Sequence, residues 1–236
     1  MNWSLAAFTC CATLATSVAH ASDAHSRHTD ESDDIDGTAE LGVGVLSLPT
    51  AEVCSARETG RCREGDTSLM LEVWQLFRVN HRFAAGAGIT LGLFPTTDAP
   101  RSDPEGVTRN HSRGYLTAEG IARIFFLQGP PWEGWIGATG GLVVVSDTYS
   151  PRGSSSDRAL VGPRGVTTRT EGYTLGLATG VAYEVATDLN LGLSLRYGLW
   201  SLPTTPAKNT LGDEASLTGR NSTLLVGVSV GYRVRL

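Results

Sequence analysis

The sequence has little positive charge and no long apolar run. Of its 236 residues only one, Lys208, is a lysine, and the formal net charge is −5. No run of about 18 consecutive apolar residues occurs, which excludes a bundle of membrane-spanning helices. The acidic balance argues against a nucleic-acid-binding protein. The 28 glycines argue against a helical bundle, because each glycine costs about 1 kcal/mol inside a helix.

The N-terminal residues 1–21 predict an export signal. They contain no Asp, Glu, Lys or Arg, and they end in Ala19-His20-Ala21, which has the A-x-A form of a signal-peptidase site. Residues 22–38 follow as an acidic tail with six carboxylates against one arginine. Dense like charge and low hydrophobicity are typical of disorder, so we expect a disordered periplasmic tail before the folded domain.

Two cysteines, Cys54 and Cys62, remain after the predicted export signal. In an exported protein such a closely spaced pair predicts a disulfide that closes a short loop. These two thiols, or His25 and His28 of the tail, could in principle bind a metal, but neither pair has a third ligand nearby in the sequence. We therefore expect no metal site and no cofactor.

The rest of the chain alternates apolar residues with small or polar ones eight times. In residues 189–200 the odd positions are Leu or Tyr throughout, while the even positions are mostly Asn, Gly, Ser and Arg. A period of two predicts a strand. The other segments with this pattern are residues 39–48, 68–79, 83–94, 114–127, 133–146, 173–185 and 224–236.

Short and long connections alternate between these predicted strands. The long ones are residues 49–67, 95–113, 147–170 and 202–221. The short ones are centred on residues 80–81, 128–131 and 186–188. This order predicts antiparallel up-and-down strands, with all short turns at one end and all long loops at the other.

Two closed barrels fit this pattern. A soluble barrel would turn the apolar face inward, and a membrane barrel would turn it outward to lipid. The apolar face carries more large side chains than the interior of an eight-stranded barrel can hold. The opposite face is mainly Gly, Ala, Ser and Thr, which suit a narrow lumen. We therefore predict an all-β fold, an eight-stranded antiparallel transmembrane β-barrel, over residues 39–236.

Charged side chains on the predicted lumen face nearly balance in sign. Desolvated carboxylates and guanidinium groups need partners, so we expect two stacked clusters of ion pairs that plug the lumen. Independently hydrated charges are the alternative. The expected turn-end cluster is Glu40, Arg78, Glu184 and Arg233, the expected mid-height cluster is Glu72, Glu119, Arg123 and Arg196, and Arg235 shares the same face.

Aromatic residues of the apolar face gather near the short turns. This placement is typical of a girdle at a membrane interface, although strand propensity alone also supplies aromatic residues. The expected girdle consists of Phe77, Phe83, Phe126, Trp132, Tyr183 and Tyr232.

Together, the export signal, the eight amphipathic segments and the alternating loops resemble the small bacterial outer-membrane barrels of the OmpA/OmpX/OmpW type. Through Gly231, Val234 and Leu236, the last eight residues are similar to the assembly signal of that class, whose final residue is usually aromatic. The resemblance implies a location in the bacterial outer membrane, insertion by the barrel-assembly machinery, contact with outer-membrane lipids, and surface-exposed loops.

No catalytic motif stands out in the chain. His111 and Ser112 lie at the loop end, but neighbours in sequence point to opposite faces of a strand, and no G-x-S-x-G motif occurs. We expect no enzyme and no catalytic residues. The leading hypothesis is a structural or surface-interaction role, through long loops that bind an unidentified ligand. A narrow pore or carrier for small or apolar solutes is the alternative, and a lipid-modifying barrel enzyme ranks third.

Overall fold

The computed structural model describes residues 36–54, 62–98, 109–151, 165–209 and 212–235. The side chains of residues 52–54, 62, 63, 97, 98, 109, 151 and 235 are outside this description. The described residues belong to one compact unit, Asp33–Leu236. The predicted export signal and most of the acidic tail lie outside the described residues. No described helix is long and apolar enough to cross a membrane.

The described residues form nine strands in eight positions of a ring. All strand pairings are antiparallel, and β3 and β4 occupy one position because both pair with β5. The strands are β1 (Asp36–Cys54), β2 (Cys62–Asn80), β3 (Phe83–Gly92), β4 (Thr96–Asp98), β5 (Arg109–Gly129), β6 (Trp132–Pro151), β7 (Val166–Ala186), β8 (Leu189–Ser201) and β9 (Arg220–Arg235).

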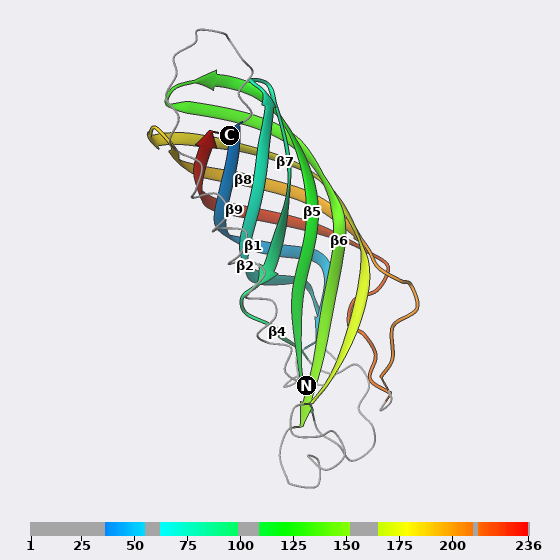
Figure 1. Cartoon of the computed structure of the whole chain (residues 1–236). Coiled ribbons are helices and arrows are strands. Elements are labelled where there is room, and N and C mark those ends of the chain that lie inside the picture. The colour runs from blue at the N-terminus through cyan, green and yellow to red at the C-terminus, as the bar shows by residue number, and fades with distance from the viewer. Residues whose placement is uncertain (1–35, 55–61, 99–108, 152–164, 210–211, 236) are drawn as a thin grey trace. The chain divides into compact units, whose positions relative to one another are not determined.

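The ladder closes on itself. The first strand, β1, pairs with β2 on one side and with β9 on the other, and pairing between β3 and β5 completes the ring. In Figure 1 the blue β1 lies next to the red β9. This confirms the predicted eight-stranded antiparallel up-and-down barrel.

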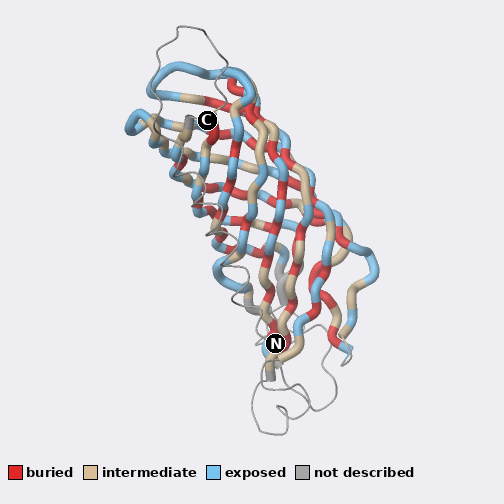
Figure 2. The backbone as a smooth tube through the Cα atoms, viewed as in Figure 1, coloured by how far each residue is buried: buried red, intermediate tan, exposed pale blue. Residues whose placement is uncertain are grey.

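Buried and exposed residues alternate along most of each strand (Figure 2), as expected where successive side chains point to the lumen and to the exterior. Along β8, Leu191, Leu193 and Leu195 are about half exposed, whereas Trp200 is 3% exposed. Each of the eight barrel positions therefore presents a row of large apolar side chains to the outside, as expected for a barrel whose solvent is hydrocarbon. We call this exposed surface the apolar belt; it carries Phe77 and Trp132 near the turn end and Tyr173 and Tyr197 towards the loop end.

Most strands extend beyond the predicted ranges. Strand β6 continues to Pro151, and β7 begins at Val166, seven residues before the predicted start. The outward side chains of these extensions are polar, including Thr148, Arg169 and Glu171. The alternation of apolar residues therefore marks the apolar belt and not the whole strand, because the belt is the part of the sheet that faces lipid.

The lumen holds more than small residues and charges. Large apolar side chains form two buried clusters inside the ring. The cluster nearer the turns is Trp74, Leu76, Ala84, Ile121, Phe125, Trp135 and Ala178. The cluster nearer the loops is Leu46, Leu48, Ala51, Met70, Tyr115, Val143, Val145, Trp200, Leu202, Leu217 and Leu225.

Glycines make room for the lumen tryptophans on neighbouring strands. Gly180 is the register partner of Trp135, and Gly88 is the partner of Trp74. A methyl group on Gly180 would lie 2.6 Å from Cζ2 of Trp135 and 2.8 Å from the carbonyl oxygen of Leu193. The indole ring of Trp135 thus occupies the space that a side chain at position 180 would need.

We expect Gly180→Ala to lower the free energy of unfolding by about 1–3 kcal/mol, because the ring must move to admit the methyl group. Gly140→Ala is the matched control, since its methyl group would lie 3.6 Å from the nearest atom of Leu175. Urea unfolding in detergent micelles measures both. Equal losses would show that the lumen ring does not need the glycine.

Candidate functional site

The barrel lumen is the candidate functional site, because polar side chains from all parts of the ring meet inside it. The group nearest the short turns is the turn-end cluster of Arg78, Glu133 and Arg233. Arg78 donates two hydrogen bonds to Glu133, at 3.0 and 3.1 Å, and Arg233 donates a third at 3.2 Å. The guanidinium of Arg78 also lies 4.0 Å from the ring centroid of Phe125.

Sequence reasoning missed Glu133. It follows a short turn directly, outside the clearest part of the alternation, but it has the same parity as the lumen-facing Gly137 and Thr139, and that parity could have identified it. The expected member Glu184 is partly exposed and forms no ion pair with another described residue. The side chain of Arg235 lies outside the described residues.

The second lumen group is the Glu40–Arg123 pair. Arg123 donates hydrogen bonds of 2.7 and 2.8 Å to the two carboxylate oxygens of Glu40. Its guanidinium lies 4.0 Å from the ring centroid of Trp135. The sequence placed these two residues in different clusters, because heights along separate strands do not show how far long side chains reach across the lumen.

The third group is the central cluster of Glu72, Glu119 and Arg196. Arg196 bridges both carboxylates, with 2.5 Å between its Nη1 and Oε2 of Glu119. Hydroxyl groups of Thr90, Thr117 and Thr174 donate further hydrogen bonds to the two carboxylates. The Arg196 guanidinium lies 5.0 Å from the ring centroid of Trp74.

Each of these three groups therefore combines an arginine, one or more carboxylates and an aromatic ring. Guanidinium groups can pair with a carboxylate at their edge while their face lies on a ring. The voids between the groups are small: about 30 Å³ between the Glu40–Arg123 pair and the central cluster, and about 20 Å³ on the loop side of the central cluster. Voids of this size hold one or two water molecules.

A fourth polar group, which the sequence did not predict, lies at the loop end. This loop-end network consists of Asp66, His111, Arg113, Tyr115, Asp147 and Ser216, all at most 3% exposed. Arg113 donates a hydrogen bond of 3.0 Å to Asp66 and one of 2.6 Å to the hydroxyl of Ser216. Tyr115 donates to the same oxygen of Asp66.

Asp147 joins the β8–β9 connection to the barrel wall. Its carboxylate accepts hydrogen bonds from the Ser216 hydroxyl at 2.5 Å and from the Ser216 backbone N–H at 3.1 Å. It also lies 2.7 Å from Nε2 of His111. Next to Ser216, Leu217 is 2% exposed and belongs to the loop-side apolar cluster. The connection between β8 and β9 is therefore folded inward as part of the lumen packing.

The pKa of Asp147 follows from these contacts. The residue lies beyond the apolar belt, since its register partner Thr168 is next to the exposed Arg169. Burial alone would raise its pKa, but the hydrogen bonds from His111 and Ser216 outweigh this effect and hold the pKa below its ordinary value. Asp147 is therefore a carboxylate that the folded state stabilises.

The loop-end network contains Ser, His and Asp but does not have the geometry of a nucleophilic triad. Asp147 lies between His111 and Ser216, and the serine hydroxyl donates to the carboxylate. In a triad the histidine contacts the nucleophile directly. His111 is 1% exposed, and Ser112 lies on the opposite face of β5. The arrangement fits a structural contact.

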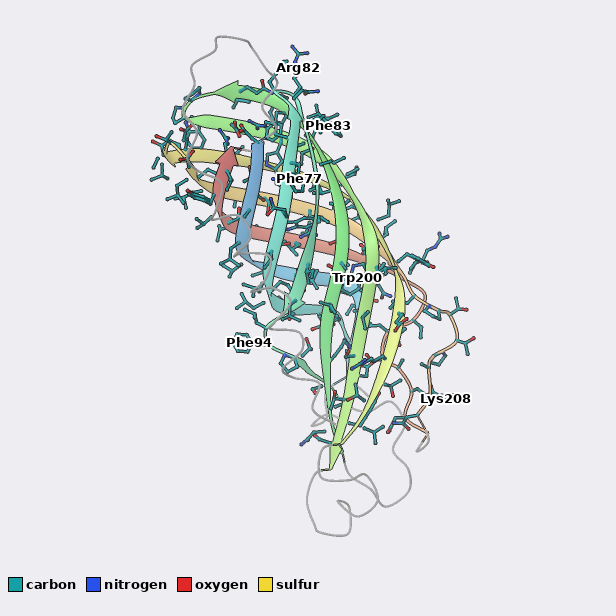
Figure 3. All side chains as sticks on the ribbon, viewed as in Figure 1. Phe77, Arg82, Phe83, Phe94, Trp200 and Lys208 are labelled. Carbon is teal, nitrogen blue, oxygen red and sulfur yellow. The ribbon has the colours of Figure 1, made fainter. Side chains whose placement is uncertain are left out.

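The exterior carries the other expected features. Phe77, Phe126, Trp132, Tyr183 and Tyr232 are 40–65% exposed, and the rings of Trp132 and Tyr183 lie 4.8 Å apart. Figure 3 places Phe83 and Arg82 at one end of the barrel, and Phe94 and Lys208 at the other. These aromatic side chains thus lie at the turn end, where the girdle is predicted; its contact with a membrane interface stays a prediction.

Two further predictions remain open. The backbone register pairs Cys54 with Cys62, but both side chains lie outside the described residues, so the disulfide stays a prediction. In the expected assembly signal Gly231 is buried and Val234 is partly exposed, while Leu236 lies outside the described residues.

No family model and no curated protein matches the chain. The fold is similar to Neisserial surface protein A (15% identity, TM-score 0.44, covering 86% of this chain and 97% of that one). It is also similar to Ail of Yersinia pestis (9%, 0.49, 85% and 99%) and to the outer-membrane protease OmpT of Escherichia coli (11%, 0.37, 88% and 99%).

The expected resemblance to small outer-membrane barrels is confirmed at the level of the fold. The closed ladder of the described strands leaves no strand position of the ring unpaired, and the exterior of the barrel is apolar over the height of the apolar belt. These are the two requirements for a sheet that spans a membrane. The described part of the chain is therefore a closed β-barrel whose apolar exterior fits a lipid bilayer.

We expect Arg196→Met to lower the free energy of unfolding by about 3–5 kcal/mol, because it leaves two buried carboxylates without their cation. Adding Glu72→Gln and Glu119→Gln should restore most of the loss. Lys208→Met is the matched control: its ion pair with Glu214 is 2.7 Å long, but the Lys208 side chain is 60% exposed, so we expect a change below about 1 kcal/mol. Similar losses in Arg196→Met and Lys208→Met would contradict this account.

The single lysine provides a test of the inward-folded connection. A lysine-specific protease can cut this chain only after Lys208. We expect it to cut the variants Asp147→Asn and Ser216→Ala several times faster than the wild type. Both variants lose hydrogen bonds that hold residues 212–219 against the barrel wall. Thr148→Val is the control, since Thr148 bonds to Thr167 on the outer face. Cleavage at the wild-type rate in Asp147→Asn would refute the role of this carboxylate.

The lowered pKa of Asp147 also predicts a dependence on pH. A carboxyl group whose pKa is lower in the folded than in the unfolded state stabilises the protein above its ordinary pKa, and this stabilisation is lost as the pH falls through the folded value. The difference in unfolding free energy between wild type and Asp147→Asn should therefore shrink between pH 7 and strongly acidic pH. A difference that stays constant or grows would contradict the assignment.

Proposed function

We propose that the protein is a closed outer-membrane barrel that anchors surface-exposed loops, with a structural or surface-interaction role. The observation that carries this proposal is the filled lumen. Ion pairs, aromatic rings and two apolar clusters occupy the interior from the turn-end cluster to the loop-end network, and the voids between them have the size of water molecules. Such an interior supports anchoring better than passage of solutes.

The loop end supports the same role. Strands β5, β6 and β7 continue beyond the apolar belt as a sheet, with β4 paired to β5 at its side, and the outward side chains of these three extensions are polar. The β8–β9 connection is fastened inside this sheet through Ser216 and Tyr149, whose hydroxyl donates to the carbonyl oxygen of Glu214 at 2.5 Å. A rigid polar platform above the membrane is suited to contact with molecules outside the cell. Its ligand is unidentified.

The expected partners follow from this proposal. Outer-membrane lipids would surround the apolar belt, and the barrel-assembly machinery would insert the chain through its C-terminal strand. A narrow pore or carrier is the competing function, and ion conductance in a planar lipid bilayer distinguishes a pore from an anchor. An enzymatic role draws no support from the described geometry of His111, Asp147 and Ser216.

We expect purified protein in planar lipid bilayers to show no steady ion conductance, because no solute can pass the central cluster. The double variant Trp74→Ala/Arg196→Ala should conduct, since it removes a ring and the guanidinium beside it. Val73→Ala, on the lipid-facing side of the same strand, is the control and should stay closed. Steady conductance of the wild type would favour the pore.

A further inference from the structure

One polar side chain of the apolar belt has no hydrogen-bond partner. Gln75 of β2 is exposed on the outer face of the barrel, between Val73 and Phe77. The belt also contains Thr179 of β7, but the hydroxyl of Thr179 donates to the carbonyl oxygen of Trp135 at 2.9 Å. Gln75 forms no hydrogen bond with another residue of the described part of the chain. Hydrocarbon offers its amide neither a donor nor an acceptor, which is unfavourable.

Gln75 lies well inside the belt and not at its edge. Exposed apolar side chains of the same strand lie on both sides of it, Leu69 and Val73 towards the loops and Phe77 and Val79 towards the turns. A strand that rises about 3.3 Å per residue at a tilt of about 40° makes the stretch from Leu69 to Val79 about 25 Å tall and places Gln75 about 10 Å from its turn end. This distance exceeds the length of a glutamine side chain, so the amide does not reach the headgroup region.

Small residues lie beside Gln75 on the outer face of the neighbouring strands. Its register partners are Ala39 of β1 and Ala87 of β3, and the partner of Ala87 on β5 is Gly120. By contrast, the outward positions of β8, across the ring from β3, are all Leu or Tyr from residue 189 to 199. Small residues allow a second backbone to approach closely within a membrane. The small-residue patch consists of Ala39, Ala85, Ala87, Ala118, Gly120 and Ala122.

The packing of the barrel itself does not require a glycine at position 120. The φ angle of Gly120 is not positive, and its ladders with β3 and β6 have no register shift there. A methyl group on Gly120 would lie 3.7 Å from the carbonyl oxygen of Gly86 and 3.8 Å from that of Gly140, which is ordinary contact. At the lumen positions Gly180 and Gly88 a methyl group would instead lie 2.6 and 2.4 Å from a tryptophan ring. A strand glycine without a reason inside the fold is typical of a place where another backbone approaches.

We propose that Gln75 and the small-residue patch bind a second copy of this chain in the plane of the membrane. Two copies inserted in the same direction are related by a twofold axis along the membrane normal, and a residue near that axis faces its own copy at the same depth. A residue can satisfy its own copy only if it carries both donors and an acceptor, and the primary amide of glutamine carries both. Two Gln75 side chains can therefore form reciprocal hydrogen bonds, which lipid tails cannot provide.

The pairing rests on the proposed membrane location of the barrel, but it does not depend on the closed lumen or on the surface role. A barrel that conducts ions could still pair through the same patch. Conversely, a barrel that stays monomeric could still anchor surface loops.

Energy transfer between donor-labelled and acceptor-labelled copies in liposomes tests the pairing. The dyes are attached to Thr167→Cys on the polar extension of β7, with the native cysteines replaced by serine. Insertion is checked first by the faster migration of unboiled protein on a denaturing gel, and a chain that does not insert overturns the membrane location together with the pairing. In the inserted wild type, transfer should rise as the lipid-to-protein ratio falls and should disappear when unlabelled copies are added. An inserted wild type that is monomeric at every ratio overturns the pairing alone, because lipid then covers the patch.

Four variants make the test specific to this face. Gln75→Leu removes the amide and keeps the belt apolar, and Gly120→Leu fills the patch; each should lower the association constant by about tenfold. Thr179→Val removes a belt hydroxyl that is already hydrogen-bonded, and Leu193→Phe enlarges a side chain on β8; both should pair as the wild type does. Association of wild-type strength in both Gln75→Leu and Gly120→Leu overturns the proposal.

Distances between spin labels on two copies locate the interface directly. Labels on Ala39→Cys, beside Gln75, should give one short and well-defined distance between copies. Labels on Leu193→Cys, across the ring, should give a much longer one. The reverse order would place the contact on the leucine-covered face and overturn the proposal.

Discussion

The narrow lumen of an eight-stranded barrel determines the rest of this structure. Such a ring has room for side chains but not for bulk water, so each charge inside it must find its partner among other side chains. Arg78, Arg123 and Arg196 meet this requirement in the same way, with a carboxylate at the edge of the guanidinium and an aromatic ring against its face. Glycines such as Gly180 are equally necessary, because the ring of Trp135 occupies the space that a side chain there would need.

Lipid explains why the sequence was so informative about the exterior. Hydrocarbon accepts only apolar side chains, so every outward position from Leu189 to Leu199 is Leu or Tyr. That pattern predicts the strand, the face that points outward and a membrane environment. The same reasoning fails where lipid ends. Residues 147–151 and 166–172 continue as strands, but polar residues occupy both of their faces, and the sequence there gives no periodic signal.

The interior was harder to predict, because its contacts join residues that are distant in the chain. Arg113 and Ser216 are 103 residues apart, and Asp147 and Ser216 are 69 apart. No local pattern indicates that a serine of a long connection will bind an aspartate of another hairpin. The alternation of odd and even positions does identify residues that face the lumen, including Glu133 and Trp135. It does not show which of these residues form ion pairs: Glu40 contacts Arg123, which was expected at another height of the barrel.

The central claim is that the apolar face contacts hydrocarbon while the opposite face is packed, with voids for only a few water molecules. Spin labels on single cysteines at successive positions of β8, with the native cysteines replaced by serine, test it most directly. In lipid bilayers, labels at positions 191, 193 and 195 should collide readily with oxygen, and labels at 192 and 194 should be shielded from both oxygen and a water-soluble nickel reagent. Free collision of the nickel reagent with positions 192 and 194 would show a water-filled lumen and contradict the account.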